Sequence, residues 1–207
     1  MDAEYIKTLL KSIADIMQKN RELLIEMDSK VGDGDLGLTM SDGFEAAYNQ
    51  VKSSEETDIG KLLYMAGKAM STAVPSTMGT LMASGLMQAG KELRGTIECK
   101  EEDIVTLFDA YENGVAKRGK AKVGEKTFLD GIHPANIALK ASIEAGDSLL
   151  TAATKSAQAA RLGYEDTLTM LAVHGRCATR GEASRTLKDP GAYVAVLIME
   201  AFQASLS

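Results

Sequence analysis

Residues 28–37 read Asp28-Ser29-Lys30-Val31-Gly32-Asp33-Gly34-Asp35-Leu36-Gly37, and this stretch distinguishes among the fold classes open to the chain. Three aspartates fall within eight residues, among glycines that allow uncommon backbone angles and the close approach of a ligand. At an effective dielectric constant of about 20, two carboxylates ~4 Å apart repel each other by roughly 4 kcal/mol, so the arrangement favours bound cations. Mg²⁺ typically binds a few carboxylates together with substrate phosphates. The stretch therefore predicts a metal–phosphate site.

Two other interpretations of the stretch are unfavourable. Gly32, Gly34 and Gly37 match the G-x-G-x-x-G pattern of dinucleotide-binding proteins, but that pattern requires a preceding strand, and residues 5–27 carry helical periodicity. The residues that follow Asp33 lack the central glycine and the final glutamate of an EF-hand loop. A solvated acidic turn remains an open alternative, because aspartate and glycine are common turn residues.

Apolar residues recur at three- and four-residue steps along most of the chain, which predicts helices rather than strands. The predicted helices cover roughly residues 5–27, 41–52, 58–73, 79–93, 104–115, 133–145, 148–161, 164–174 and 194–202. Each proline lies where a loop could turn into a helix. We expect one all-α domain over residues 1–207, with about eight antiparallel helices and the functional site in the loops at one end.

Composition limits the classes of partner. The formal net charge of −6 and the lack of a basic stripe argue against nucleic-acid binding. No apolar run reaches the roughly 18–20 residues of a membrane span, and the N-terminus lacks a signal-peptide core. Cys99 and Cys177 are far apart in sequence, which favours reduced thiols. The expectation is a cytoplasmic protein that binds neither nucleic acid nor membrane.

Three more loops suit an anionic ligand. Residues 74–80 open a helix and could bind an anion through free amides, or simply cap the helix with Ser76 or Thr77. Residues 118–127 are basic and nearly match a P-loop, but they lack its strand, so a solvated basic loop is an equal alternative. Residues 175–185 carry three arginines, which suit phosphate forks or surface charge balanced by nearby carboxylates.

Taken in order, these loops form a recognisable series of motifs. The motifs are Asp28-x4-Asp33-x-Asp35-x-Gly37-Leu38, residues 74–79, Arg118-Gly119-Lys120-Ala121, Gly124-x-Lys126-Thr127-x2-Asp130, Gly175-Arg176-x4-Gly181-Glu182-x-Ser184 and Asp189-Pro190-Gly191-Ala192. Over nearly its whole length, the chain resembles the L subunit of dihydroxyacetone kinase, the DAK2-type nucleotide-binding domain.

The resemblance implies an eight-helix antiparallel barrel that holds ADP or ATP and two Mg²⁺ ions at one end. Asp28, Asp33 and Asp35 would be the catalytic metal ligands. The other implied nucleotide-binding positions are Leu36, Thr39, Ser76, Thr77, Gly79, Gly119, Arg176, Asp189 and Gly191. A separate K-type subunit would hold a small ketose, and ATP or a phosphohistidine protein of the sugar phosphotransferase system would supply the phosphoryl group.

The chemistry of the residues agrees with this resemblance. Phosphoryl transfer depends on charge neutralisation and alignment more than on covalent participation by the protein. Such a site needs neither a Ser-His-Asp set nor a catalytic cysteine. His133 and His174 are the only histidines, and neither is assigned a catalytic role.

Some positions depart from the family pattern. Leu36 and Thr39 stand where the family usually has histidine and asparagine, the loop at residues 74–80 has changed, and Leu187 replaces a second histidine. One hypothesis is therefore a different small ketose, such as a four-carbon one. Two other functions stay open at this point: a nucleotide-state sensor that binds a transcription regulator, and the nucleotide domain of a fatty-acid kinase.

Overall fold

The computed structural model describes residues 1–206, and within this range it contains nine α-helices, two 3₁₀ helices and no strand. The α-helices are α1 (Ala3–Lys19), α2 (Arg21–Val31), α3 (Leu36–Val51), α4 (Ile59–Ala73), α5 (Thr77–Glu92), α6 (Glu101–Gly119), α7 (Phe128–Glu144), α8 (Leu149–Asp166) and α9 (Pro190–Ala204). The 3₁₀ helices η1 (Thr167–Thr169) and η2 (Arg176–Thr186) lie between α8 and α9. The all-α prediction is confirmed.

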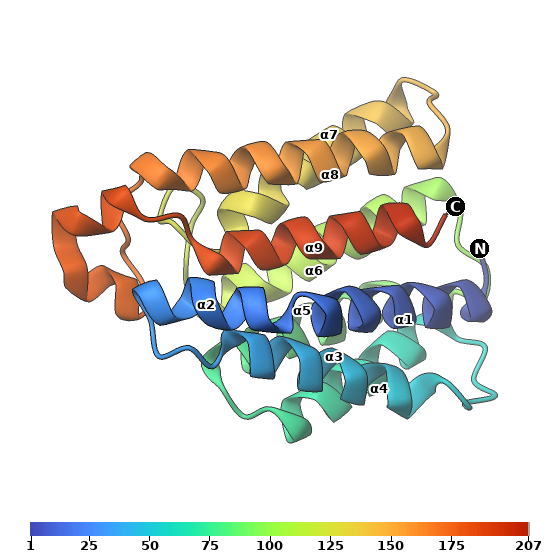
Figure 1. Cartoon of the computed structure of the whole chain (residues 1–207). Coiled ribbons are helices and arrows are strands. Elements are labelled where there is room, and N and C mark those ends of the chain that lie inside the picture. The colour runs from blue at the N-terminus through green and yellow to red at the C-terminus, as the bar shows by residue number, and fades with distance from the viewer. Residues whose placement is uncertain (207) are drawn as a thin grey trace.

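α1 and α2 act as one member of the bundle. They follow each other along nearly the same line (Figure 1) and are separated only at Asn20, whose φ of −100° and ψ of 11° interrupt the helix. When α1 and α2 are counted as one member, the described part of the chain forms a bundle of eight long antiparallel members, as the sequence predicts.

Small residues let neighbouring helices approach closely. A Cβ atom on Gly60 of α4 would lie 2.5 Å from the Gly90 carbonyl oxygen of α5, and one on Gly90 would lie 2.6 Å from the Gly60 carbonyl oxygen. No side chain fits at either position without moving the backbone of the facing helix. Around these contacts, one apolar core runs through the bundle and includes the fully buried Phe44 and Phe202.

Two sequence predictions for the segment after α8 are wrong. The helix predicted over residues 164–174 does not form, because α8 continues from Leu149 to Asp166 and then gives way to η1 and non-helical residues. The apolar side chains that suggested periodicity remain partly in solvent, with Leu168 39% and Val173 52% exposed. Conversely, residues 176–186, which we expected to be a loop, form η2 with a kink at Gly181.

The prediction for Pro134 is also wrong, since this residue lies inside α7 rather than at its start. Proline has no N–H, so the Asp130 carbonyl one turn earlier loses its helical donor. Gly163 of α8 packs against that carbonyl so closely that no Cβ atom would fit. α7 and α8 therefore pack tightly where the helical hydrogen bond is missing, and α7 continues beyond this point to Glu144.

The bundle has two different ends. Both termini lie at one end, whereas η2 and the α2–α3 loop lie at the other (Figure 1). α3, α5, α7 and α9 all begin at this second end, where a cavity opens. Among the described helices, none is both long and apolar enough to span a bilayer. Cys99 and Cys177 are free thiols, and both are buried.

Candidate functional site

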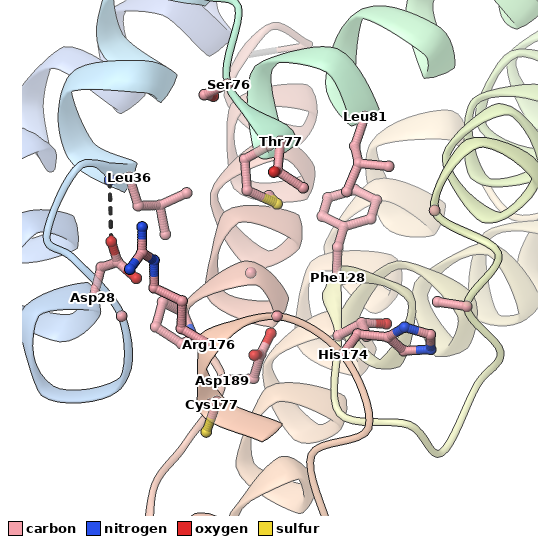
Figure 2. A pocket seen from close by; sticks show the side chains of 18 of the residues that line it. Asp28, Leu36, Ser76, Thr77, Leu81, Phe128, His174, Arg176, Cys177 and Asp189 are labelled. Atoms are coloured by element: carbon pink, nitrogen blue, oxygen red, sulfur yellow. Dashed lines mark hydrogen bonds between the residues drawn. The ribbon is translucent and has the colours of Figure 1, made fainter. Parts of the chain in front are cut away.

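A cavity of about 750 Å³ occupies the loop end of the bundle, and most of the predicted site residues line it (Figure 2). The predicted residues on its wall are Asp28, Asp33, Asp35, Leu36, Ser76, Thr77, Gly119, Arg176, Asp189 and Gly191. They come from five separate parts of the chain. The fold thus brings together the motifs that the sequence placed in different loops.

Thr39 and Gly79 do not line the cavity but lie behind residues that do. Thr39 is buried on α3, where its N–H donates to the Asp35 carbonyl at 2.9 Å. The Gly79 N–H donates to the Ser76 hydroxyl at 3.0 Å, and a Cβ atom on Gly79 would overlap the Val74 carbonyl. Both residues therefore shape the starts of α3 and α5.

Asp28, Asp33 and Asp35 converge at one edge of the cavity. Each contributes a carboxylate oxygen, and these oxygens all lie within 4.8 Å of one another. Asp28 is half-buried and accepts a hydrogen bond from the Leu36 N–H at 3.3 Å, whereas Asp33 and Asp35 are exposed. Burial, together with the charges of Asp33 and Asp28, raises the pKa of Asp35. The side chains thus form a cluster of negative charge.

This cluster fits a divalent cation. With Mg–O distances of about 2.0–2.1 Å, opposite ligands of an octahedral Mg²⁺ lie about 4.2 Å apart. Three oxygens within 4.8 Å therefore suit one shared ion after a small adjustment, or ions bridged by phosphate oxygens. The protein already places one cation here, because Arg176 Nη2 lies 2.6 Å from Asp33 Oδ2.

Helix N-termini surround the same cavity. The first residues of α3, α5, α7 and α9 all line it, namely Leu36, Thr77, Phe128 and Pro190. A helix N-terminus carries partial positive charge and unpaired amides, so it attracts anions. Acidic ligands for a cation thus lie next to helix ends that favour phosphate.

Asp189 caps one of these helices from a half-buried position. Its Oδ2 accepts from the Ala192 N–H at 2.7 Å, and its own N–H donates to the Thr167 hydroxyl at 3.0 Å. Burial raises the pKa of Asp189 to about 7, against the opposing effect of the Ala192 hydrogen bond. A Cβ atom on Gly191 would lie 2.9 Å from Asp189 Oδ2, which accounts for glycine two residues after the cap.

The opposite wall is apolar and was missed by the sequence analysis. Leu81 and Phe128 lie across the cavity from Asp28 and Arg176 (Figure 2), and Val115 also lines this region. Helical periodicity marks a residue such as Val115 as inward-facing, but it does not separate packed core from cavity wall.

His174 and Cys177 also line the cavity, although sequence reasoning assigned neither to the site. His174 Nε2 lies 2.6 Å from Glu125 Oε2, and this hydrogen bond lowers the pKa of Glu125. Burial raises the pKa of the Cys177 thiol, so it is not an activated nucleophile.

Among the basic residues of the neighbouring loops, roles differ. Arg118 and Lys126 both line the cavity, but Lys126 is almost fully buried and its ammonium group donates to backbone carbonyls. Arg185 forms an ion pair with Glu182 at 2.8 Å, as the surface-charge alternative predicts. Arg176 is the arginine of its loop that reaches the acidic cluster.

Comparison with known proteins places this site in a family. Residues 30–204 match the model of the DAK2 domain. The chain is 29% identical over 191 residues to the ADP-binding subunit DhaL of the PEP-dependent dihydroxyacetone kinase of Escherichia coli (strain K12), covering 92% of this chain and 91% of that protein. It is 27% identical over 208 residues to the ADP-binding subunit DhaL of PEP-dependent dihydroxyacetone kinase 2 of Listeria innocua, covering 100% of this chain and 96% of that protein.

A solved structure shares the fold. The crystal structure of the dihydroxyacetone kinase from C. freundii in complex with AMP-PNP and Mg²⁺ superposes with a TM-score of 0.70 at 20% sequence identity. The match covers 98% of this chain and 33% of that chain, so this chain spans about a third of the C. freundii kinase. Since the family model covers most of the sequence, the chain belongs to the DAK2-domain family.

Proposed function

We propose that this chain is the ADP- or ATP-binding, Mg²⁺-dependent subunit of a dihydroxyacetone-type kinase, and that it passes a phosphoryl group to a small ketose held by a separate K-type subunit. The observation that carries this proposal is the cluster of three carboxylates, within 4.8 Å of one another, beside four helix N-termini on a single cavity. The E. coli relative is named as an ADP-binding kinase subunit, and the C. freundii kinase was crystallised with AMP-PNP and Mg²⁺.

In this proposal, Asp28, Asp33 and Asp35 hold two Mg²⁺ ions. The ions would neutralise phosphate charge and align the transferring group. Arg176 balances the charge of Asp33 in the free chain. Once Asp33 binds a cation, the Arg176 guanidinium becomes available for a phosphate, which its planar fork suits.

The rest of the cavity would hold the nucleoside. Ser76 and Thr77 present hydroxyl groups at the start of α5, and Gly119, Asp189 and Gly191 complete the wall. The apolar side formed by residues such as Leu81 and Phe128 suits a planar base. Leu36 lies at the α3 N-terminus beside the cluster, while Thr39 and Gly79 would support the site without touching the nucleotide.

The partner and the donor are part of the same proposal. A K-type subunit would present the ketose at the open end of the cavity, and ATP or a phosphohistidine protein of the phosphotransferase system would renew the phosphoryl group. Two free, buried cysteines suit a reducing compartment, in line with action in the cytoplasm. The substitutions at Leu36 and Leu187 leave the four-carbon ketose as the alternative substrate to test beside dihydroxyacetone.

Calorimetry on the nucleotide-stripped chain tests the binding step. We expect ADP and ATP to bind with Mg²⁺ and to dissociate when EDTA is added. Binding that EDTA leaves unchanged would contradict a carboxylate–metal site. Incubation with a K-type subunit, a phosphoryl donor and either dihydroxyacetone or erythrulose then tests transfer. Metal-dependent binding without any sugar phosphate would contradict the kinase function and favour a nucleotide sensor.

A further inference from the structure

Lys126 has an unusual environment for a lysine. Only 2% of the residue is exposed, and its ammonium group forms no ion pair with any described carboxylate within 4.0 Å. Instead, Nζ donates to the carbonyl oxygens of Thr167 at 2.6 Å, Ser184 at 2.8 Å and Met170 at 3.4 Å, and also to that of Leu187. Carbonyl dipoles thus replace water around a buried charge.

These carbonyls belong to the two ends of one segment. Thr167 and Met170 belong to η1 and its exit, whereas Ser184 and Leu187 belong to the end of η2 and the residue after it. Lys126 therefore joins the beginning of the segment 167–187 to its end.

Apart from Lys126, the segment is supported by few apolar contacts and by polar bonds in its middle. The Val173 N–H donates to the Glu125 carbonyl at 3.3 Å, His174 pairs with Glu125, and Arg176 pairs with Asp33. The buried apolar contacts of the segment form a small cluster of Val31, Ala172 and Cys177, separate from the main core. Beyond Lys126, the two ends are joined by the Ala172 N–H, which donates to the Ser184 hydroxyl at 3.1 Å, and by an exposed bond from Arg185 to the Thr169 carbonyl. A segment with so few apolar contacts depends on its polar links.

The turn that carries Lys126 is itself held in place. Lys126 has a φ of 62°, a left-handed conformation that a non-glycine residue adopts only when its surroundings impose it. Asp130 accepts from the Gly124 N–H at 2.5 Å and from the Thr127 N–H at 2.7 Å, so the backbone is bound on both sides of Lys126. The ammonium group therefore projects from a rigid base.

Segment 167–187, whose two ends Lys126 contacts, contributes residues to the cavity wall. Arg176, which pairs with Asp33, lies in its middle. At its beginning, Thr167 accepts from Lys126 through its carbonyl and from the Asp189 N–H through its hydroxyl. We propose that Lys126 is a positioning residue, which holds segment 167–187 in the form that places Arg176 and Asp189 at the cavity.

Hydrogen exchange of the nucleotide-free chain, followed by mass spectrometry, tests this role. In Lys126→Met, we expect exchange in segment 167–187 to accelerate by roughly a hundredfold while α3 to α5 keep their protection. Lys122→Met is the matched control, because Lys122 lies on the same loop with an exposed side chain. Unchanged exchange in Lys126→Met, or equal acceleration in both variants, would overturn the proposal, and so would equal loss of protection in every helix.

Chemical rescue separates the ammonium group from general packing. In Lys126→Ala, propylammonium replaces the missing atoms, while propanol fills the same space without the charge. We expect propylammonium alone to restore slow exchange; restoration by neither compound, or by both equally, would overturn the role of the cation. Should Lys126→Met fail to fold, Lys126→Gln, which keeps two amide hydrogens as donors, carries the exchange test with the same criteria.

The functional consequence rests on the proposed nucleotide site and is measured separately. We expect Mg²⁺–ADP to bind Lys126→Met about tenfold more weakly than wild type, with propylammonium restoring the affinity of Lys126→Ala. Wild-type affinity in a variant with a loosened segment would overturn the link to the cavity. If the wild-type chain binds no nucleotide, the proposed function fails, but the exchange result still decides whether Lys126 holds the segment.

Discussion

Two regions at the mouth of the cavity carry their charge in opposite ways. In the α2–α3 loop, Asp33 and Asp35 are exposed like charges beside Asp28, and Arg176 is the basic residue within 1–206 that reaches this cluster to form an ion pair. Beside segment 167–187, by contrast, the Lys126 ammonium group is buried, and its hydrogens are bound to backbone carbonyls of that segment. A charge whose hydrogen-bonding capacity is already used stabilises structure, whereas a charge left open to solvent can accept a ligand.

The largest expected effect comes from the open charges. Asp35→Asn should weaken Mg²⁺–ADP binding by about a hundredfold, or about 2.8 kcal/mol, because it removes one of the three proposed metal ligands. Calorimetry compares this variant with Glu22→Gln, which removes an exposed carboxylate from α2. Equal affinities in the two variants would show that Asp35 does not bind the metal.

Arg176 should have a smaller effect on the same measurement. Arg176→Met should weaken Mg²⁺–ADP binding by about tenfold, or about 1.4 kcal/mol, since one phosphate contact is lost while the carboxylates remain. Arg180→Met, in the same 3₁₀ helix, is the control. Tighter binding in Arg176→Met would instead mean that the ion pair with Asp33 competes with the metal.

The Asp189 carboxyl should make the stability of the folded chain depend on pH. Its pKa is raised to about 7 by burial, above the ordinary value of about 3.9, so the folded chain binds the proton more tightly than the unfolded chain. This contribution to stability is fully present below about pH 4 and is lost as the pH rises through about 7.

Urea denaturation without metal, at a series of pH values, measures this contribution. Asp189→Asn keeps a side chain able to cap α9 and removes the titration, so its stability should fall less than that of wild type between about pH 5 and 8. Parallel curves for the two proteins would show that the Asp189 carboxyl does not titrate in this range.

The smallest effect concerns the stability of the metal-free chain. Asp35→Asn should raise the melting temperature slightly, because repulsion from Asp33 and Asp28 is relieved. Asp33→Asn should lower it by about 1–2 °C, since the Arg176 ion pair is an exposed one worth about 0.5 kcal/mol. Calorimetric scans in EDTA compare the two, and shifts of the same sign would contradict this distinction between neighbouring aspartates.

Some features could be predicted because they depend on local sequence. The helical periodicity of the chain is enough for the all-α fold, and the short spacing from Asp28 to Asp35 ensures that these carboxylates come together. Ser76, one of the two cap candidates that the sequence offers, does cap α5. These features require interactions only between residues close in sequence.

Other features depend on contacts between distant parts of the chain. The helix predicted over residues 164–174 ends at Asp166, and just beyond this end Lys126 binds two carbonyls, an interaction across more than forty residues. Pro134 lies inside α7, where Gly163 of another helix packs closely against the carbonyl that the proline leaves without a helical donor. The distinction between apolar core and cavity wall, as at Leu81, likewise follows from where helices diverge.

The amino-acid sequence by itself determined that this protein is a helical bundle with an acidic, glycine-rich loop, since periodicity and short-range spacing encode both. Only the tertiary structure decided which charges remain open to a ligand. Arg176 and Lys126 are both basic residues in loops, yet one reaches the acidic cluster and the other is buried among carbonyls. Their difference arises from the chain segments that pack around each side chain, and these segments are distant in sequence.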